Sequence, residues 1–279
     1  MTINIDPVAF SIPLPFIGWW PIHWYGISWL LAIFSILWYA KRIVSKKTPF
    51  NENDIDDFLF YGVLGAIIGG RLGYMFFYGT DQIFNDPISI FRVWEGGLSF
   101  HGGFIGVLVS FFIFSKKLNI DFFDLADHIA LAFPIGLGMV RIGNFLGGEL
   151  LGRPTDLPWG MIFWSDPLQI SRHPSQLYQA FFEGLVLFVI LNFLATKPKP
   201  KIFISGMFLT LYGSFRIFTE TFRMPDSHIG FDFFDIITRG QLLSTPMVII
   251  GLRLIFRSYR KKNETCLLYT SPSPRDGIG

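Results

Sequence analysis

Six ionisable residues stand inside or beside strongly apolar stretches of this chain, and each could take part in chemistry. On membrane-insertion scales, a charged side chain at the centre of a spanning helix costs about 2.5–3.5 kcal/mol. A sequence that keeps such residues therefore indicates internal ion pairs or a binding site. The six are Arg71, Glu95, His101, Arg141, Glu149 and Arg216.

Arg216 belongs to a polar group on one predicted helix. Tyr212, Arg216, Glu220 and Arg223 follow one another at steps of four, four and three residues, which places them on one helical face. One interpretation is an Arg–Glu pair that neutralises itself, and Glu220 suits that interpretation. The other is an anion-binding arginine, for which Arg216 is the candidate because it lies deeper in the apolar sequence.

Arg141 ends another apolar stretch, and glycines follow it at positions 147, 148 and 152. So many glycines predict a non-helical re-entrant turn, which a membrane tolerates only where protein buries it or where it lines a cavity. Asn144 and Glu149 lie in the same segment, and Asn144 can both donate and accept hydrogen bonds. The alternative for Arg141 is an interfacial side chain that reaches out to water.

His101 is flanked by glycine pairs at residues 96–97 and 102–103. A catalytic or ligand-binding role and a satisfied core histidine are both open for it. The other four histidines show no ligand-like spacing with acids, and the single cysteine, Cys266, lies in the C-terminal tail. The sequence therefore predicts no metal site and no cofactor.

Two deep arginines, a histidine and an amide predict a cavity that opens toward one leaflet of a membrane. The planar fork of arginine matches the geometry of phosphate. The phosphate-bearing molecule native to that depth is a phospholipid. The residues by themselves therefore indicate a phospholipid-binding site, and no pattern points to nucleic acid.

The elements that must position these residues are membrane helices. Apolar residues make up 51% of the 279 positions and charged residues 16%, whereas soluble domains carry about 25% charged residues. Seven stretches approach the ~20 apolar residues that a spanning helix needs. We therefore expect an all-α integral membrane protein with about seven spans, at residues 24–40, 58–78, 98–115, 125–142, 177–195, 202–222 and 241–256.

Every lysine lies in alternate connections between these spans or directly after the seventh span. Because lysine and arginine accumulate on the cytoplasmic side, the pattern predicts an N-terminus outside and a C-terminus in the cytoplasm. The outer-face loops are then residues 79–97, 143–176 and 223–240, around the central cavity. Residues 1–264 are expected to form a single membrane domain, and residues 265–279 a disordered or non-native tail.

Two further patterns concern packing and the membrane surface. Glycines recur every four residues at positions 65, 69 and 73, and again at 102 and 106. This small-xxx-small pattern lets membrane helices approach closely, so we expect the second and third spans to pack together. Aromatic residues interleaved with prolines in residues 10–25 predict a segment that lies on the outer leaflet.

These motifs, in this order and spacing, resemble the prolipoprotein diacylglyceryl transferase family over residues 12–260. One departure is Gly147, where many members of that family have a second asparagine. The matching stretches are residues 23–26 (HWYG), 69–74 (GGRLGY), 91–97 (FRVWEGG), 99–103 (SFHGG), 141–145 (RIGNF), 148–153 (GELLGR) and 172–178 (RHPSQLY).

The resemblance implies an activity, its partners and a location. Such enzymes move the diacylglyceryl group of phosphatidylglycerol to the thiol of the lipobox cysteine in a preprolipoprotein signal peptide, and glycerol phosphate leaves. The implied location is the bacterial inner membrane, among membrane lipids, with the active site toward the periplasmic leaflet. The expected catalytic residues are His101, Arg141, Arg216 and Tyr25. The expected substrate-binding residues are Arg141, Asn144, Glu149, Gly152, Arg216, Glu220 and Arg71.

Other classes of protein remain as alternatives. An anion or phospholipid transporter could use the same arginine-lined cavity, although no internal repeat suggests two inverted halves. An intramembrane serine protease would need a nucleophile turn such as Gly-x-Ser-x-Gly paired with a histidine, and none is present. A purely structural scaffold would not need deep arginines around a glycine-rich turn.

Overall fold

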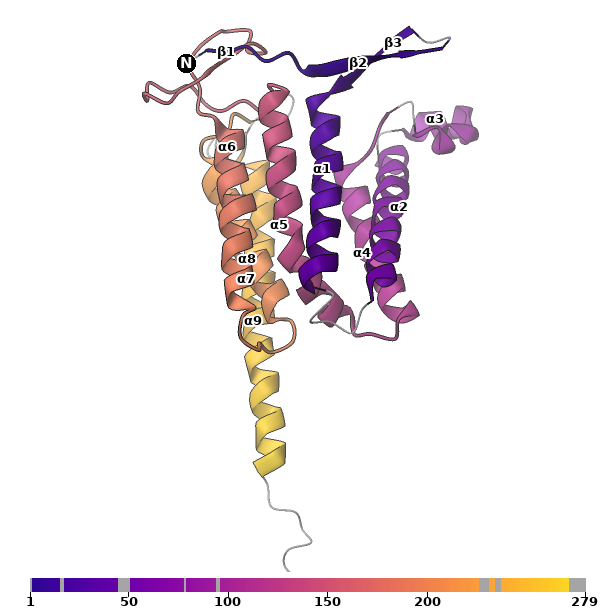
Figure 1. Ribbon diagram of the computed structural model, residues 1–279, viewed down its shortest axis with the longest axis vertical. Coiled ribbons are helices and arrows are strands. Elements are labelled where there is room, and N and C mark those ends of the chain that lie inside the picture. The colour runs from indigo at the N-terminus through magenta and orange to yellow at the C-terminus, as the bar shows by residue number, and fades with distance from the viewer. Residues whose placement is uncertain are drawn as a thin grey trace, which may run out of the picture. The chain divides into compact units, whose positions relative to one another are not determined.

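The computed structural model is mostly helical and describes residues 2–15, 18–44, 51–77, 79–93, 96–225, 231–233 and 237–270 (Figure 1). Within these ranges, the side chains of residues 43–44, 81–82, 100–101, 231–233, 239 and 261–270 lie outside the description. The chain forms two compact units. The larger unit is Met1–Ile36 with Ile129–Gly279, and the smaller unit is Leu37–His128. The single membrane domain expected for residues 1–264 stays a prediction.

The smaller unit is built around two closely packed helices, α2 and α4. A Cβ atom added at Gly69 would lie 2.4 Å from the carbonyl oxygen of Gly102, and one at Gly65 would lie 2.5 Å from that of Gly106. Any side chain here would drive the helices apart, which confirms the predicted glycine packing. The elements are η1 (Ala40–Val44), α2 (Glu52–Phe77), α3 (Thr80–Asn85), η3 (Pro87–Phe91) and α4 (Phe100–Lys117).

Ion pairs gather at one end of the smaller unit. Lys41 lies 2.6 Å from Asp56, and Lys117 lies 2.9 Å from Asp57. Both aspartates stand in the first turns of α2, where negative charge complements the helix dipole. Because both lysines contact the start of α2, the ends of η1 and α4 that carry them lie on the same side of this unit. This agrees with the prediction that lysines lie in alternate connections between spans. The side of the membrane that this end faces stays a prediction.

The larger unit contains the remaining helices and three short two-stranded sheets. Helices α6, η5 and α7 follow one another without a break and form one helical run. The elements are β1 (Thr2–Ile3), β2 (Val8–Leu14), β3 (Gly18–His23), α1 (Trp24–Tyr39), α5 (Phe122–Leu146), β4 (Ile162–Phe163), α6 (Ser175–Gln179), η5 (Ala180–Val186), α7 (Leu187–Leu194), α8 (Phe203–Glu220), β5 (Phe231–Phe233), β6 (Ile237–Thr238) and α9 (Arg239–Thr270).

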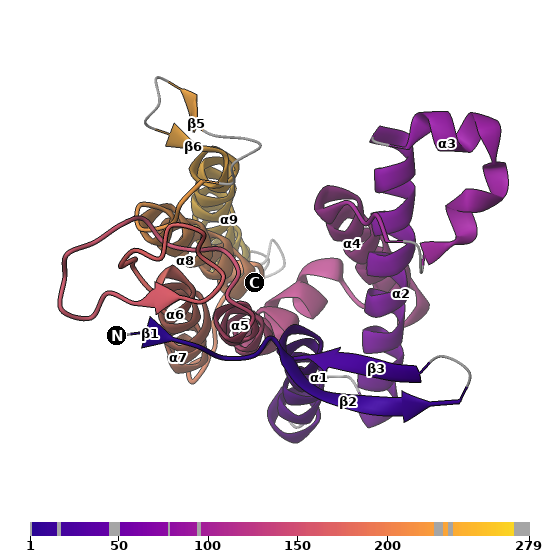
Figure 2. The same cartoon turned by 90° about the horizontal axis from the view of Figure 1, so that it is seen from above.

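The N-terminal aromatic segment forms an antiparallel hairpin of β2 and β3, which the sequence analysis did not predict (Figure 2). The register runs from Val8 opposite His23 to Leu14 opposite Gly18. Prolines in both strands hide the strand pattern in the sequence, yet a two-stranded hairpin accommodates them because each strand has a free edge. Large rings such as Trp19, which is 72% exposed, project from the hairpin. This exposure agrees with the expected surface segment.

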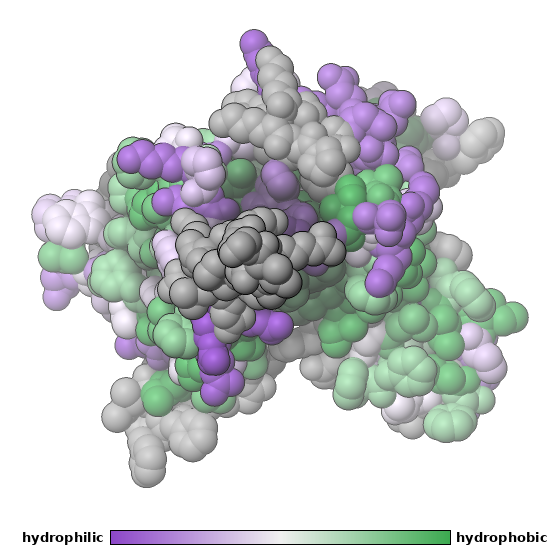
Figure 3. All heavy atoms as spheres, turned by 90° about the horizontal axis from the view of Figure 1, so that it is seen from below, coloured by the Kyte–Doolittle hydropathy of each residue, from purple (hydrophilic) through white to green (hydrophobic). Residues whose placement is uncertain are grey.

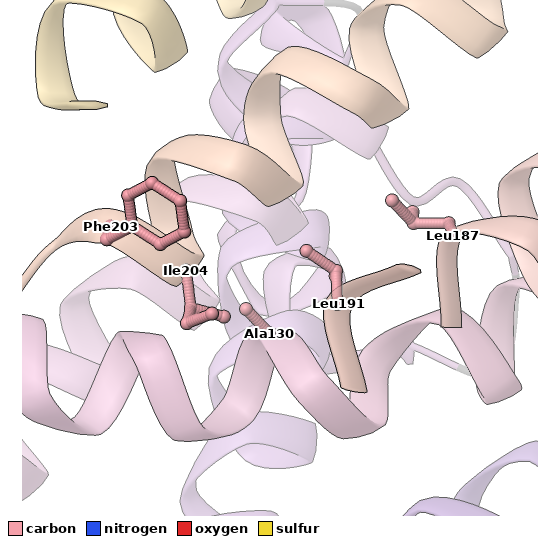
Figure 4. Close-up of a cluster of buried hydrophobic side chains, with 5 residues drawn as sticks. All are labelled: Ala130, Leu187, Leu191, Phe203 and Ile204. Carbon is pink, nitrogen blue, oxygen red and sulfur yellow. The ribbon is translucent and has the colours of Figure 1, made fainter. Parts of the chain in front are cut away.

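Aliphatic and aromatic side chains form the core of the larger unit between α5, α7 and α8 (Figure 4). Leu187 and Leu191 have no exposed surface. Asn192 lies beside them and donates to the carbonyl oxygens of Phe188 at 2.9 Å and Leu131 at 3.2 Å, so its amide group ties α7 to α5. The clustered residues are Ala130, Leu187, Leu191, Phe203 and Ile204.

Among the described residues, four helices are long and apolar enough to cross a membrane: Glu52–Phe77, Phe122–Leu146, Ser175–Leu194 and Gly240–Arg260. Helices also occupy the other three expected spans but do not meet both conditions; α1 has 16 residues, and α4 and α8 have 18 each. Large apolar side chains point outward from the helices, as on a lipid-facing surface (Figure 3). The protein is therefore an integral membrane helical protein, and the number of seven spans stays a prediction.

The C-terminal helix α9 continues through Thr270. It thus includes the first residues of the segment 265–279 that was expected to be disordered or non-native. Residues 271–279 lie outside the described part of the chain. The expectation that the tail is disordered or non-native therefore stays a prediction.

Candidate active site

A fully buried carboxylate, that of Glu183, lies between two of the arginines singled out in the sequence. Its Oε2 atom is 3.4 Å from Nη2 of Arg141 on α5, and its Oε1 atom is 3.6 Å from Nη1 of Arg216 on α8. The hydroxyl of Thr219 donates to Oε1 at 3.0 Å. One residue of η5 therefore holds the two arginines at a common centre.

The ion pairs continue along α8 and form what we call the charge chain: Arg141, Glu183, Arg216, Glu220 and Arg223. Nη2 of Arg216 is 3.1 Å from Oε2 of Glu220, and Nη1 of Arg223 is 3.3 Å from Oε1 of the same carboxylate. The predicted Arg216–Glu220 pair is thus present. Each of the two carboxylates, Glu183 and Glu220, thus lies between two guanidinium groups.

The two arginines that contact Glu183 are more accessible than the carboxylate between them. The side chain of Glu183 is 0% exposed, whereas those of Arg141 and Arg216 are 17% and 13% exposed. In addition, Nη1 of Arg216 is buried without a hydrogen-bond partner among the described residues. A small anion that reaches these guanidinium groups would supply an acceptor atom for this nitrogen.

Glu183 was missed in the sequence analysis, although a signal for it exists. It is the only charged residue in the expected span 177–195, and a charge within an apolar span indicates a partner or a function. The sequence does not show which charges it meets. Arg141 and Arg216 are 42 and 33 positions away, respectively, so only the packing of three helices reveals the pairing.

The glycine-rich segment after α5 leaves the helix, as predicted, but only beyond Leu146, so Arg141 and Asn144 stand on the last turns of α5. The amide Nδ2 of Asn144 donates to Oε2 of Glu149 at 3.0 Å. This contact joins two of the expected substrate-binding residues. Whether the segment re-enters a membrane stays a prediction.

Hydrogen bonds from the 172–178 motif hold the backbone around Glu149. Gln176 donates to the carbonyl oxygen of Glu149, Ser175 to that of Leu150 at 3.0 Å, and Arg172 to that of Gly152 at 3.2 Å. The amide of Met224 donates to Leu151 at 3.0 Å. Because four consecutive carbonyl groups are engaged, the position of the Glu149 side chain is set by residues far along the chain.

Close backbone contacts fix the positions of two expected site residues, Gly152 and Tyr25. A Cβ atom at Gly152 would lie 2.0 Å from the carbonyl oxygen of His173, so only glycine permits this approach. At the start of α1, Tyr25 lies against α5, since a Cβ atom at Gly143 would be 3.5 Å from the Cα atom of Tyr25. Tyr25 and Gly152 are thus both brought to the end of α5 that carries Asn144.

An ion pair closes the loop between Gly152 and the 172–178 motif. Arg172 donates to both carboxylate oxygens of Asp166, at 2.8 and 2.9 Å, and both side chains are buried. These hydrogen bonds lower the pKa of Asp166. Next to this pair, the hydroxyl of Tyr178 accepts from Trp159 at 2.8 Å and lies 3.3 Å from Nδ1 of His173, whose pKa is lowered by burial.

Arg71 lies in the smaller unit, and its guanidinium group is directed at a loop. It is 3% exposed and donates to the carbonyl oxygens of Ser89, Ile90 and Gly96. In this structure Arg71 therefore holds the segment that follows α3, and its expected substrate contact stays a prediction. The helix position of His101 is the second residue of α4, but its side chain and Glu95 lie outside the described residues.

The structure thus brings together seven of the expected residues in the larger unit, and Arg71 and His101 belong to the smaller unit. Within the described residues, no group of three His, Cys, Asp or Glu side chains could hold a metal ion. The seven residues are Tyr25, Arg141, Asn144, Glu149, Gly152, Arg216 and Glu220.

These features define a class: a helical membrane protein with a buried cluster of arginine and glutamate side chains between its helices. Comparison with known proteins gives the family. A family model for prolipoprotein diacylglyceryl transferase matches residues 7–257. The chain belongs to the prolipoprotein diacylglyceryl transferase family.

Similar proteins occur in several bacteria, each named phosphatidylglycerol–prolipoprotein diacylglyceryl transferase. The one from Marinomonas sp. is 49% identical over 256 residues, which cover 90% of this chain and 92% of the relative. That from Teredinibacter turnerae is 47% identical and covers 92% of each chain. That from Pseudomonas syringae pv. syringae is 46% identical, over 92% of this chain and 95% of the relative. The protein is a bacterial membrane protein.

The Asp166–Arg172 pair makes the stability of the folded protein depend on pH. Because the pKa of Asp166 is lower in the folded protein than its unfolded value of about 3.9, its stabilising effect is present above that value and is lost as the pH falls through the folded pKa. We expect Asp166→Asn to lower the thermal midpoint of the detergent-purified protein at pH 7. The difference from the unaltered protein should shrink below about pH 4.

The matched control is Asp156→Asn, which changes an exposed aspartate of the same loop. Removing one partner of a buried pair typically costs about 3–5 kcal/mol, whereas surface substitutions change stability by about 0.5 kcal/mol or less. Equal thermal midpoints for the two variants at pH 7 would contradict the assignment of the pair to stability.

Proposed function

We propose that this protein transfers the diacylglyceryl group of phosphatidylglycerol to the lipobox cysteine of a preprolipoprotein and releases glycerol phosphate. Family membership supports the reaction class, and the protein is accordingly a transferase. The observation that carries the proposal is the Glu183 carboxylate held between Arg141 and Arg216, whose side chains remain partly exposed. A phosphodiester is the anion that suits this centre.

The reaction itself explains why such a centre is useful. The thiol sulfur attacks the glyceryl carbon next to the phosphate, so an S–C bond forms and the C–O bond to phosphate breaks. The phosphodiester carries one negative charge, and the departing phosphate monoester develops a second. Groups that bind this growing charge stabilise the transition state more than the ground state.

In this mechanism, Arg141 and Arg216 are the donors to the phosphate. Glu183 is a positioning residue, because its two oxygens hold the guanidinium groups before the substrate arrives. Preorganised donors need little rearrangement as charge develops, and that is the reason they are effective. Glu220 performs the same positioning for Arg216 from the next helical turn.

The remaining expected residues have roles around this centre. Asn144 and Glu149 are proposed to bind the polar part of the lipid, because they lie together at the end of α5. Gly152 allows the chain to pass close to His173 there. Tyr25, at the start of α1, is proposed to contact a substrate beside α5. Arg71 is proposed to support the substrate-facing loop whose carbonyl groups it binds.

His101 is the proposed general base. The attacking thiol has a reference pKa of about 8.5, and a neutral imidazole with a reference pKa of about 6.5 can accept its proton. This role comes from the family resemblance around residues 99–103 and from the lack of a cysteine in the expected spans. The thiol of the substrate therefore attacks directly, without a covalent enzyme intermediate.

The proposed location is the bacterial inner membrane, with the N-terminus outside and the active site toward the periplasmic leaflet. The lysine asymmetry supports the orientation, and the gathering of lysine-bearing ends in the smaller unit agrees with it. A preprolipoprotein presents its lipobox at that leaflet, and phosphatidylglycerol is available in the same layer.

The function is tested by incubating the purified protein with phosphatidylglycerol and a synthetic lipobox peptide, followed by mass measurement of the peptide. We expect the mass of one diacylglyceryl group to be added to the cysteine peptide, and none to a serine-substituted peptide. Headgroup release should match peptide modification one for one. Headgroup release without peptide would indicate a phospholipase, and lipid movement without covalent change would indicate a transporter.

Arg141→Ala and Arg216→Ala should each nearly abolish this activity in protein that still inserts into membranes. Loss of one preorganised donor typically lowers the rate by about 10²–10³-fold. Lysine should rescue poorly at either position, since a point charge lacks the planar fork. Arg253→Ala, which changes an exposed arginine on α9, is the control and should retain normal kcat. Near-normal activity of either site variant would remove that arginine from the mechanism.

His101→Gln separates a base from a headgroup ligand. If His101 accepts the thiol proton, the variant should lose about 10²–10⁴-fold in kcat while the protein remains folded. A raised KM with unchanged kcat would assign His101 to lipid binding instead.

A further inference from the structure

Three buried amide side chains next to the charge chain carry atoms without hydrogen bonds among the described residues. These atoms are Oδ1 of Asn144, Oε1 of Gln176, and both Oε1 and Nε2 of Gln179. Asn144 is 4% exposed, and the two glutamines are 0% exposed. Buried polar atoms in native proteins nearly always have partners, so several orphaned atoms in one place indicate a polar ligand or water.

The three amides form a continuous stripe, which we call the amide track: Asn144, Gln176 and Gln179. Gln176, Gln179 and Glu183 follow at steps of three and four residues, which places them on one face of the run from α6 into η5. Asn144 and Arg141 stand one turn apart on α5.

Contacts between the two helices join these faces. Asn144 and Gln176 both hydrogen-bond to Glu149, and Arg141 pairs with Glu183 one or two turns further along. The backbones also approach closely here, since a Cβ atom at Gly184 would lie 2.7 Å from the Cα atom of Gly138. The amide track therefore runs directly into the arginine cluster that is proposed to hold the phosphate.

The chemistry of the amide track favours hydroxyl groups. An amide offers donors and acceptors together and carries no charge, and a hydroxyl group offers the same combination. Turning the Gln179 amide over would not remove the mismatch, because both of its polar atoms lack partners among the described residues. A cationic headgroup would instead bring its positive charge next to the guanidinium groups of Arg141 and Arg216. An apolar group would leave the amides unsatisfied.

We propose that the amide track binds the free glycerol of the phosphatidylglycerol headgroup and thereby selects a neutral polyol over other headgroups. This inference rests on the proposed function, in which the phosphate lies at Arg141 and Arg216. Asn144, Gln176 and Gln179 are then specificity-determining residues. A site built to hydrogen-bond a hydroxyl group discriminates strongly against a substrate that lacks it, because the buried polar atoms of the protein are left unpaired.

The test compares two lipids that share acyl chains and a single negative charge: phosphatidylglycerol and phosphatidylmethanol, whose headgroup lacks hydroxyls. We would measure kcat/KM for thioether formation on the lipobox peptide with each lipid. The unaltered protein should prefer phosphatidylglycerol. Gln179→Met, which keeps the side-chain length and removes the amide, should reduce this preference at least tenfold, as expected for the loss of one or two hydrogen bonds to a buried group.

The control variant is Asn192→Leu, which removes a largely buried amide from the same helical run. Its Nδ2 atom donates to the backbone carbonyl groups of Leu131 and Phe188, so its loss should lower stability and leave the lipid preference unchanged. An unaltered lipid preference in Gln179→Met would overturn the inference. The glutamines would then only bind water or contribute to packing. Absence of any thioether product from the unaltered protein with phosphatidylglycerol would instead contradict the proposed function.

A measurement on the unaltered protein covers the case in which Gln179→Met does not fold. Glycerol phosphate and methyl phosphate carry the same phosphate group, and they differ in the hydroxyls that the amide track would bind. We expect glycerol phosphate to inhibit the transfer at least tenfold more strongly. Equal inhibition by the two would overturn the inference, because the polyol would then add nothing to binding.

Discussion

A carboxylate with no exposure to solvent constrains everything around it, and in this protein that carboxylate belongs to Glu183. Moving an ion out of water costs several kcal/mol, which only close counter-charges and hydrogen bonds can offset. Arg141, Arg216 and Thr219 supply them from α5 and α8. Three helices must therefore meet at one place, and the same contacts that satisfy Glu183 hold two guanidinium groups ready for phosphate.

The segment that carries Glu183 is a π-helix, η5, inserted between two α-helical stretches. Such insertions are uncommon and are frequent at functional sites, because they shift side chains from the α-helical register. Here the glycine that follows, Gly184, allows close approach to Gly138 of α5. The close approach brings Glu183 within range of Arg141. The π-helical geometry of η5 and its close packing on α5 together produce the contact between Glu183 and Arg141.

Around Glu149 the structure depends on backbone hydrogen bonds rather than on charge. The 172–178 motif and the end of α8 bind consecutive carbonyl groups of residues 149–152. The Asp166–Arg172 ion pair joins two positions of the loop that follows Gly152. A segment that looks flexible from its glycine content is in this way held at fixed positions. Such rigid support is what a binding site needs if its donors are to be preorganised.

Much of this arrangement could be predicted from the sequence, because it depends on local or periodic features. Apolar runs predict helices wherever the backbone must satisfy its own hydrogen bonds, and helices occupy all seven expected places. The four-residue spacing of glycines predicted the packing of α2 on α4. Arg141, Asn144, Glu149 and Arg216 were found because polar residues within apolar sequence are conspicuous.

What only the tertiary structure decided is the set of partners. Glu183 meets Arg141 and Arg216 across three helices, and Arg71 binds carbonyl groups of a loop within the smaller unit. The β2–β3 hairpin likewise depends on pairing that its prolines conceal. The physical reason is common to these cases. A sequence shows that a buried charge or strand must find a partner, but the identity of that partner depends on distances that exist only after the helices have packed.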